Sequence, residues 1–480
     1  MSWHLSITVD RRSSGSLTEQ VLRQIKQLIR DQVLRPGVRL PSTRQLATDL
    51  NVSRSVVVEA YQQLIAEGWL ASSQRSGTWV SYRAEQCSRR GRYVANSSHD
   101  NLRQTHLDLR PTGADITAFP RKEWLGCLTI VLRRASRLDL DYPPTSGVPA
   151  LREELAQYLG RVRGLRVLPD QVVVTVGFAQ GLSLVGHMLR RLGIHSIALE
   201  DPGQPYLRNF IEKIGLRTVG VPVDENGIDV AALERSAARS VLVTPAHQFP
   251  TGVVLAPHRR AALLDWAERV DGLIIEDDYD GELWHEPSDW RPTLQSMSPC
   301  RVIYGGTASK TLAPGLRLGW LCVPPTLVRE LERAREGHDL GTGSIEQLAY
   351  SEFIRTGRLD RHLRRMRARY RERRRTLVNV LSERLPDLQL CGSAVGAHAY
   401  LRLPPRLDER SLVTRVARQR LLIPGVTHFG LGHASPAPGL IVGYAFPPMT
   451  ILVEALHILA AAADDLAGSV HLAPATSLRG

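Results

Sequence analysis

A lysine among small residues is the first feature of the sequence that could do chemistry. Lys310 follows the run YGGTAS of residues 304–309, which continues an apolar stretch typical of a buried strand. A lysine held between small residues at a strand end can approach an aldehyde closely and form a Schiff base with it. Thr307 offers a hydroxyl and Arg317 a guanidinium, and both groups suit a phosphate.

An acidic loop follows another apolar run, at residues 272–276. The Asp277 carboxylate could hold a pyridinium nitrogen protonated, which would make such a ring an electron sink, and the Tyr279 phenol could hydrogen-bond a ring oxygen. Alone, the loop could equally bind a metal or be solvated. The order of the motifs favours the first interpretation, because Asp277, Lys310 and Arg317 all follow strands, and ligands gather at the carboxyl ends of such strands.

Two further strand ends carry suitable groups. Residues 175–181, TVGFAQG, begin a helix directly after a strand, where backbone N–H groups and the helix dipole favour a phosphate. The residues of this turn are Gly177, Phe178, Ala179 and Gln180. Residues 244–252, TPAHQFPTG, are another transition from strand to loop, and they carry Gln248.

The elements that must position these residues are short apolar runs rich in β-branched side chains. They lie at residues 171–176, 196–200, 240–244, 272–276 and 301–305. Such runs, separated by amphipathic segments, are typical of buried parallel strands in an α/β domain. The pattern predicts a large α/β domain from residue 107 onward, with a smaller C-terminal lobe.

The first 83 residues have a different pattern. The apolar residues of 17–33 fall on one helical face, a second helix begins near Ser42, and a third runs from Ser53 to Glu67. Two short strands follow, at 71–73 and 78–82. Helix, helix, turn, helix and hairpin predict a winged helix-turn-helix over residues 15–83. The Ser-, Arg- and Asn-rich residues 84–106 then predict a linker.

Small and basic side chains lie where a winged helix-turn-helix meets DNA. The candidate contacts are Arg44, Ser53, Arg54, Ser55, Arg75 and Gly77. Those at the start of the third helix can reach phosphates and base edges in the major groove, and those at the hairpin tip can approach a minor groove. Residues 1–83 hold 11 Lys and Arg against 6 Asp and Glu, a net charge of +5. Alternatively, the two helix arginines are merely solvated helix ends.

Composition excludes several classes of protein. The chain is 43% hydrophobic and 23% charged, which is ordinary for a globular protein. The longest apolar stretch, residues 451–463, is too short and too polar to span a bilayer, and no secretion signal precedes the first helix. Five scattered cysteines, and histidines without ligand spacing, predict neither a disulfide framework nor a metal site. We therefore expect a cytoplasmic protein whose charge of +13 suits a polyanion.

Residues 355–375 hold 11 arginines against Asp360 and Glu372, a net charge of +9. This segment is either a solvated amphipathic helix at the junction with the small lobe or an accessory contact to the DNA backbone.

These motifs carry a family resemblance. The stretch LRPGVRLPSTRQLATDLNVSRSVVVEAYQQLIAEGWL, with Gly77 after it, resembles the GntR family of bacterial regulators. The segments LRPTGADITAFPRKEW, YPPTSG, EDPGQPYLR, TPAHQFPTG, IIEDDYDGEL, YGGTASKTLAPGLRLGW and RHLRRMRARYRERR resemble a fold type I aminotransferase domain dependent on pyridoxal phosphate (PLP). Together they resemble the MocR subfamily of GntR regulators.

The resemblance implies a multidomain fold. A mostly α winged helix-turn-helix at 15–83 and a linker at 84–106 precede an effector and dimerisation domain at 107–475, which has an α/β large domain and a smaller α+β lobe. The resemblance also implies that Arg44, Ser53 and Arg54 contact double-stranded operator DNA, with Gly77 in the wing.

Roles at the cofactor are implied in the same way. Lys310 would hold PLP as a Schiff base, Asp277 would pair with the pyridine nitrogen and Tyr279 with the ring oxygen, and Gln248 would lie near the ring. Thr307, Arg317 and the turn of residues 177–180 would bind the phosphate. Tyr142 would reach that phosphate from the partner subunit, which requires a head-to-tail, domain-swapped homodimer.

The sequence departs from the family pattern at three places. Gln204 stands where family members usually stack an aromatic side chain on the cofactor ring. Phe178 and Ala179 replace side-chain donors in the phosphate turn. Residues 439–444 lack the arginine that anchors a substrate carboxylate in aminotransferases, and Arg208 is a possible substitute. These losses predict slow transaminase turnover at most.

Three functions therefore remain open from the sequence. The first is a regulator that binds operator DNA and senses a small amine or amino acid through its PLP-binding domain. The second is a regulator of vitamin B6 metabolism that senses PLP itself. The third is an active aminotransferase with an accessory DNA-binding domain.

Overall fold

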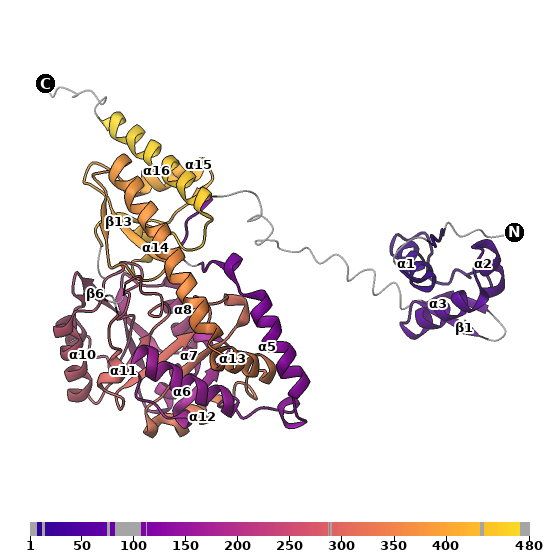
Figure 1. The fold of residues 1–480 in the computed structure, drawn as a ribbon, viewed down its shortest axis with the longest axis horizontal. Helices are drawn as coiled ribbons and strands as arrows, with labels where there is room; N and C mark the ends of the chain where they lie inside the picture. Colours follow the sequence, from indigo (N-terminus) through magenta and orange to yellow (C-terminus); the bar gives the residue numbers. More distant parts are fainter. Residues whose placement is uncertain are drawn as a thin grey trace. The chain divides into compact units, whose positions relative to one another are not determined.

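The computed structural model describes residues 7–11, 15–73, 77–81, 107–111, 113–286, 288, 290–432 and 436–470. The chain divides into two compact units, Met1–Gln104 and Thr105–Gly480 (Figure 1). The predicted linker at 84–106 lies outside the described residues. Among the helices described, none combines the length and the apolar character that a membrane crossing requires.

The first unit is a winged helix-turn-helix, as predicted. Its elements are α1 (Leu17–Arg30), α2 (Thr43–Asp49), α3 (Arg54–Ala66), β1 (Leu70–Ser73) and β2 (Gly77–Val80). Ser16 and Glu19 form a capping box at α1, and the Ser42 side chain caps α2 by accepting a hydrogen bond from the Gln45 N–H. The strands pair as an antiparallel hairpin. The apolar faces of the three helices and the hairpin share one core, which includes Val21 and Val57.

An eight-stranded sheet forms the centre of the second unit. Its order is β4 (Val172–Thr175), β11 (Gly319–Cys322), β10 (Val302–Thr307), β9 (Leu273–Asp277), β8 (Ser240–Val243), β5 (Ser196–Asp201), β6 (Arg217–Asp224) and β7 (Gly227–Ile228). The five strands predicted from sequence all appear and run in one direction. The sheet is nevertheless mixed, because β11 runs antiparallel between β4 and β10, and β7 runs antiparallel at the edge.

Helices cover both faces of this sheet, and alternate strand residues supply the two cores. One face, with Val173, Ile275 and Leu321, packs on α7 (Gly177–Arg191), α8 (Pro205–Ile214) and α12 (Val328–Arg335). The helices on the other face are α5 (Arg121–Arg134), α6 (Pro149–Arg163), α9 (Val230–Arg235), α10 (Pro257–Arg269), α11 (Leu294–Met297) and α13 (Ser344–Arg355). The result is the three-layer α/β arrangement expected from the sequence.

The long helix α14 (Arg358–Arg384) leads into a smaller α+β lobe (Figure 1). There β12 (Gln389–Cys391), β13 (His398–Arg402) and β15 (Gly439–Gly443) form an antiparallel sheet, beside α15 (Glu409–Arg418) and α16 (Met449–Val470). The short strand β14 (Leu421–Leu422) pairs with β3 (Leu107–Asp108), so the start of this unit is tied to the lobe near its end.

Candidate functional site

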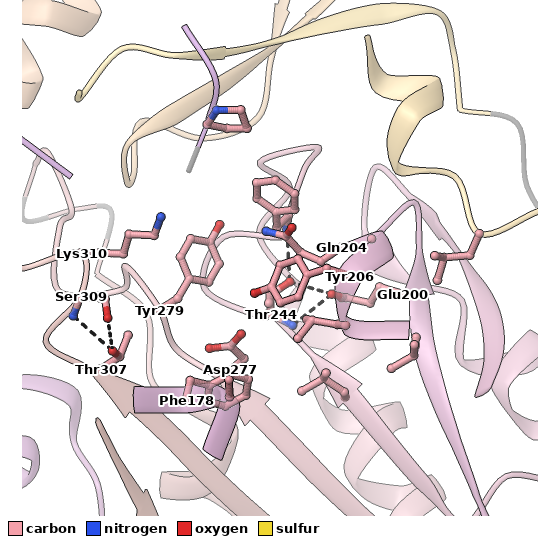
Figure 2. Close-up of a pocket in the computed structure, with 18 of the residues that line it drawn as sticks. Phe178, Glu200, Gln204, Tyr206, Thr244, Asp277, Tyr279, Thr307, Ser309 and Lys310 are labelled. Atoms are coloured by element: carbon pink, nitrogen blue, oxygen red, sulfur yellow. Dashed lines mark hydrogen bonds between the residues drawn. The ribbon is translucent and has the colours of Figure 1, made fainter. Parts of the chain in front are cut away.

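A cavity of about 350 Å³ opens at the carboxyl edge of the large sheet. The residues that line it are Pro111, Phe178, Ala179, Leu199, Glu200, Gly203, Gln204, Tyr206, Leu207, Leu242, Thr244, Phe249, Asp277, Tyr279, Thr307, Ser309, Lys310, Arg317 and Leu431. In Figure 2, Lys310, Ser309 and Thr307 lie on one side of the view, and Glu200 and Thr244 lie on the other. Ends of β5, β8, β9 and β10 thus converge here, as expected for an α/β sheet.

Asp277, at the end of β9, is buried in the floor of this cavity. Burial, and then the neighbouring Asp278 and Asp280 carboxylates, raise its pKa well above the ordinary value. Its Oδ1 atom is buried and has no hydrogen-bond partner among the described residues. Such a group is stabilised by a cationic partner, and a protonated ring nitrogen would supply one.

Lys310 lies beyond the end of β10, next to Asp277 and Asp280. Burial lowers the pKa of its amine, although both carboxylates oppose that shift. An amine that loses its proton more readily is a better nucleophile toward an aldehyde. Lys310 and Asp277 therefore have the properties that a covalently held, nitrogen-containing aldehyde requires.

Tyr279 lines the cavity and contacts a buried cluster of polar side chains behind it. Its hydroxyl donates to the His247 carbonyl at 2.8 Å, and His247 Nδ1 lies 2.9 Å from Asp280 Oδ2. The His398 ring lies beside that of His247, with centroids 4.5 Å apart and the planes tilted by 42°. His247, Asp280 and His398 bring ligand-type atoms within 4.8 Å of one another. Sequence spacing could not reveal this grouping, because its members come from three distant segments.

A basic and hydroxyl-rich corner faces the start of α7. Thr307 Oγ1 donates to Ser309 Oγ at 2.9 Å, and the Arg317 guanidinium donates to the Val176 carbonyl at 2.9 Å. Arg317 holds a left-handed backbone, with φ of 50°. Gly177 beside it has a φ of 74°, a left-handed conformation that favours glycine. An arginine and two hydroxyls at the start of a 15-residue helix fit a phosphate group.

Gly177, Gln180 and Gln248 were predicted at the cofactor but lie outside the cavity lining. Gln180 accepts a hydrogen bond from the Val176 N–H and donates to Asp339. Gln248 donates to the carbonyls of Pro202 and Phe249, at 2.9 and 2.7 Å. Both side-chain amides are thus hydrogen-bonded within the protein. Of the predicted phosphate turn, Phe178 and Ala179 line the cavity.

The predicted ligand arginine and the predicted partner residue also lie elsewhere. Arg208 donates to Glu212 at 3.0 Å and to the Leu431 carbonyl at 2.7 Å, and it is not among the lining residues. Tyr142 is 79% exposed and is not a lining residue of the cavity. Within this chain, no arginine other than Arg317 lines the described cavity.

Sequence reasoning missed several lining residues. Glu200, the last residue but one of β5, accepts hydrogen bonds from the Thr244 hydroxyl at 2.6 Å and the Thr244 N–H at 3.1 Å. Burial raises the pKa of Glu200 to about 7. Ser309 and Tyr206 also line the cavity. Glu200 is the polar last residue of the apolar run at residues 196–200, which was a usable signal, whereas Tyr206 is brought in by the first turn of α8.

In the first unit, five of the six predicted DNA contacts fall on described residues. Arg44, Ser53, Arg54, Ser55 and Gly77 are all exposed, and Arg75 lies outside the described residues. Ser53 makes no side-chain cap, and its hydroxyl lies 2.8 Å from that of Ser55. The start of α3 therefore presents its backbone N–H groups, two hydroxyls and a guanidinium at the surface.

Both units match known families. Residues 118–438 match the family described as aminotransferase class I and II, and residues 17–80 match the gntR family of bacterial regulatory proteins. The pyridoxine biosynthesis transcriptional regulator PdxR of Corynebacterium glutamicum is 34% identical, over 92% of this chain and 94% of its own. The probable rhizopine catabolism regulatory protein MocR of Rhizobium meliloti is 31% identical, over 98% of this chain and 99% of its own.

Solved structures resemble the second unit. An archaeal alanine:glyoxylate aminotransferase superposes with a TM-score of 0.68 at 25% identity, covering 76% of this chain and 92% of its own. The α-aminoadipate aminotransferase LysN of Thermus thermophilus superposes with a TM-score of 0.68 at 25% identity, covering 78% and 96%.

Proposed function

Since this chain belongs to the MocR subfamily of GntR regulators, which join a DNA-binding domain to an aminotransferase-class domain that binds pyridoxal phosphate, we propose that PLP in the cavity around Lys310 is the signal that controls its binding to DNA. The observation that carries the proposal is the convergence of Lys310, Asp277, Tyr279, Thr307 and Arg317 on one cavity.

Each of these residues has a task toward the cofactor. When bound, PLP supplies an aldehyde and an electron-withdrawing pyridine ring. The Lys310 amine would hold the aldehyde carbon, and the Asp277 carboxylate would keep a proton at the ring nitrogen. The Tyr279 hydroxyl, anchored on the His247 carbonyl, would face the ring oxygen.

The phosphate would be held in the basic and hydroxyl-rich corner that faces the start of α7. Thr307 and Ser309 would donate their hydroxyl protons to it, and Arg317 would supply the charge. Backbone N–H groups of Phe178 and Ala179 would replace the side-chain donors that this turn lacks.

The charges of the lining favour PLP itself as the signal. Lys310 and Arg317 are the cations of the described lining, and the cofactor uses both. A bound amino acid would need another cation for its carboxylate, and Arg208 is already engaged with Glu212. The relative PdxR, a regulator of pyridoxine biosynthesis, is consistent with this proposal.

A small amine without a carboxylate is the second candidate signal. Glu200 is the charged lining residue that has no assigned contact with PLP. Its pKa of about 7 leaves it partly ionised near neutral pH. A carboxyl group of this kind favours an amino group over a carboxylate in the remaining space.

The DNA contacts are proposed at the start of α3 and in the wing. Arg54 would reach a base edge, with Arg44, Ser53 and Ser55 on the backbone, and Gly77 would lie against the minor groove. The exposed positions of these side chains support the assignment.

A homodimer is proposed from exposed apolar side chains of the second unit. Leu125 and Leu132 of α5 are more than half exposed, as are Leu138, Leu140 and Tyr142 beyond it. Large apolar side chains exposed at several positions of one segment are typical of an interface between subunits. In a head-to-tail dimer it would bring Tyr142 to the partner's phosphate corner.

The affinity of the full-length protein for DNA tests the proposal. A fragment would be selected from a random-sequence library, and its dissociation constant measured without ligand, with PLP, and with PLP plus butylamine or 4-aminobutyrate. PLP alone should change the affinity by about fivefold or more. A change that appears only with butylamine would favour the second candidate, and sustained amino transfer to a keto acid would identify an active transaminase. Equal affinity in all arms would contradict the proposal.

A further inference from the structure

The segment before α8 lacks an aromatic side chain where similar proteins have one, but it carries another two residues later. Gln204 precedes α8, Pro205 is the first residue of the helix, and Tyr206 is the second. Proline at this first position fixes the helix start, so the direction of the Tyr206 side chain is set by the helix. The shift of two residues moves the ring from the loop to the first helical turn.

Tyr206 lies at the mouth of the cofactor cavity. It lines the cavity together with Asp277, whose carboxylate acts on its phenol. In Figure 2 its ring is drawn between Tyr279 and Glu200. Tyr206 is 59% exposed, whereas Leu207 beside it is buried in the core under α8. An exposed aromatic ring thus lines the same cavity as Asp277, the residue to which the pyridine nitrogen is assigned.

The other aromatic rings of the lining are held in place by packing. Phe178 packs on β10, where a Cβ at Gly305 would come within 2.4 Å of its ring. Phe249 is 5% exposed and packs edge-on against Phe429, with centroids 5.2 Å apart, and the Tyr279 hydroxyl is anchored on the His247 carbonyl. Tyr206 is thus the most exposed aromatic side chain of the described lining, and it can offer a ring face to a ligand.

We propose that Tyr206 covers the pyridine ring of bound PLP and so replaces the aromatic side chain that Gln204 cannot supply. An electron-poor pyridine and an electron-rich phenol attract each other in an offset stack. A tyrosine phenol is neutral at ordinary pH, so the Tyr206 ring carries no charge that would oppose stacking. The inference rests on the proposed cofactor site.

Titration of the full-length protein with PLP tests the inference, with visible absorption and induced circular dichroism as readouts. Tyr206→Ala should weaken PLP binding about three- to tenfold, the range expected for one stacked aromatic pair. Tyr206→Phe keeps the ring and should bind within about twofold of the wild type. Asn209→Ala, at an exposed position of α8 outside the cavity lining, is the matched control and should bind like the wild type.

Two more variants distinguish the effect of aromatic stacking from that of side-chain volume. Tyr206→Leu keeps volume without an aromatic face and should behave like Tyr206→Ala. The double variant Gln204→Tyr with Tyr206→Ala returns a ring to the usual position and should recover affinity. Wild-type affinity in both the alanine and the leucine variant would overturn the inference. If the wild type itself fails to bind PLP, the proposed cofactor site is wrong, which is a distinct result.

Discussion

Asp277 and Asp278 are neighbours in the chain with opposite environments. Asp277 faces the cavity with a raised pKa and a buried oxygen that has no partner in the described structure. Asp278 is buried against Arg163 at 2.7 Å and accepts the Tyr304 hydroxyl at 2.8 Å. Strand alternation sends one carboxylate to the site and the other into the core, so that one serves binding and the other stability.

This difference predicts opposite effects of the same substitution. A carboxyl whose folded pKa is raised above its ordinary 3.8 opposes folding once it ionises. Asp277→Asn should therefore raise the melting temperature of the apo protein by about 2–4 °C near neutral pH, and the gain should shrink as the pH falls toward that ordinary value. The same variant should weaken PLP binding.

Asp278→Asn is the matched control, because it leaves the fully buried Arg163 without its counter-charge. It should lower the free energy of unfolding by about 3–5 kcal/mol. Thermal melts of both variants at several pH values provide the measurement. A lower melting temperature for the Asp277 variant at neutral pH would refute the account of its charge.

At the residue scale, the sequence predicted the lining residues that lie at strand ends. Asp277 and Thr307 are the last residues of β9 and β10, and Lys310 lies just beyond β10. Gln180 and Gln248 followed strands as well, but their amides are satisfied by Asp339 and by loop carbonyls. Asp339 and Pro202 are distant in the chain from these two glutamines, so local sequence patterns could not predict the hydrogen bonds.

At the scale of elements, the arginines of α14 serve mainly inside the second unit. Arg369 and Arg373 reach Asp115 at 2.8 and 2.9 Å. Arg367 lies over the Trp284 ring at 3.8 Å and donates to a backbone carbonyl. These contacts favour a structural role for the helix over an accessory contact to DNA.

Asp115 should accordingly matter more than an ordinary surface acid. It is 2% exposed, and Asp115→Ala would strand the buried Arg373 without its counter-charge. The variant should lose about 3–5 kcal/mol of stability in urea unfolding. Asp360→Ala breaks the exposed pair with Arg161 and should cost less than about 1 kcal/mol. Similar losses in both variants would contradict this assignment.

The third helix of the first unit carries its own prediction. Arg54→Ala should weaken binding to a selected DNA fragment about tenfold or more, while PLP binding stays unchanged. Arg23→Ala removes an equal charge from the exposed side of α1 and controls for general attraction to DNA. Fluorescence anisotropy of labelled DNA gives both affinities. Equal losses in the two variants would mean that Arg54 does not read the sequence.

The predicted elements were most accurate where one pattern determined them. Buried β-branched runs located β4, β5, β8, β9 and β10. β11 was missed, because the strand GWLC is short and is not a β-branched run. It lies antiparallel between β4 and β10 and is joined to β10 by residues 308–318, an arrangement that no local periodicity reports.

At the scale of the whole molecule, the exposed leucines of the second unit predict self-association. Leu138 and Leu140 are 82% and 64% exposed. The double variant Leu138→Asp with Leu140→Asp should shift the protein from dimer to monomer in analytical ultracentrifugation, because burying two charges in an interface is costly. Leu168→Asp, at a comparably exposed site outside this surface, is the control. An unchanged dimer in the double variant would exclude this surface as the interface.

The most direct test of the proposed cofactor site is the visible absorption spectrum of the full-length protein titrated with PLP, recorded for the wild type, Lys310→Ala and Lys310→Arg. We expect a saturable band of lysine-bound cofactor in the wild type and none in either variant, because Lys310 is the lysine that lines the described cavity. The same band in Lys310→Ala, or no band in the wild type, would contradict it.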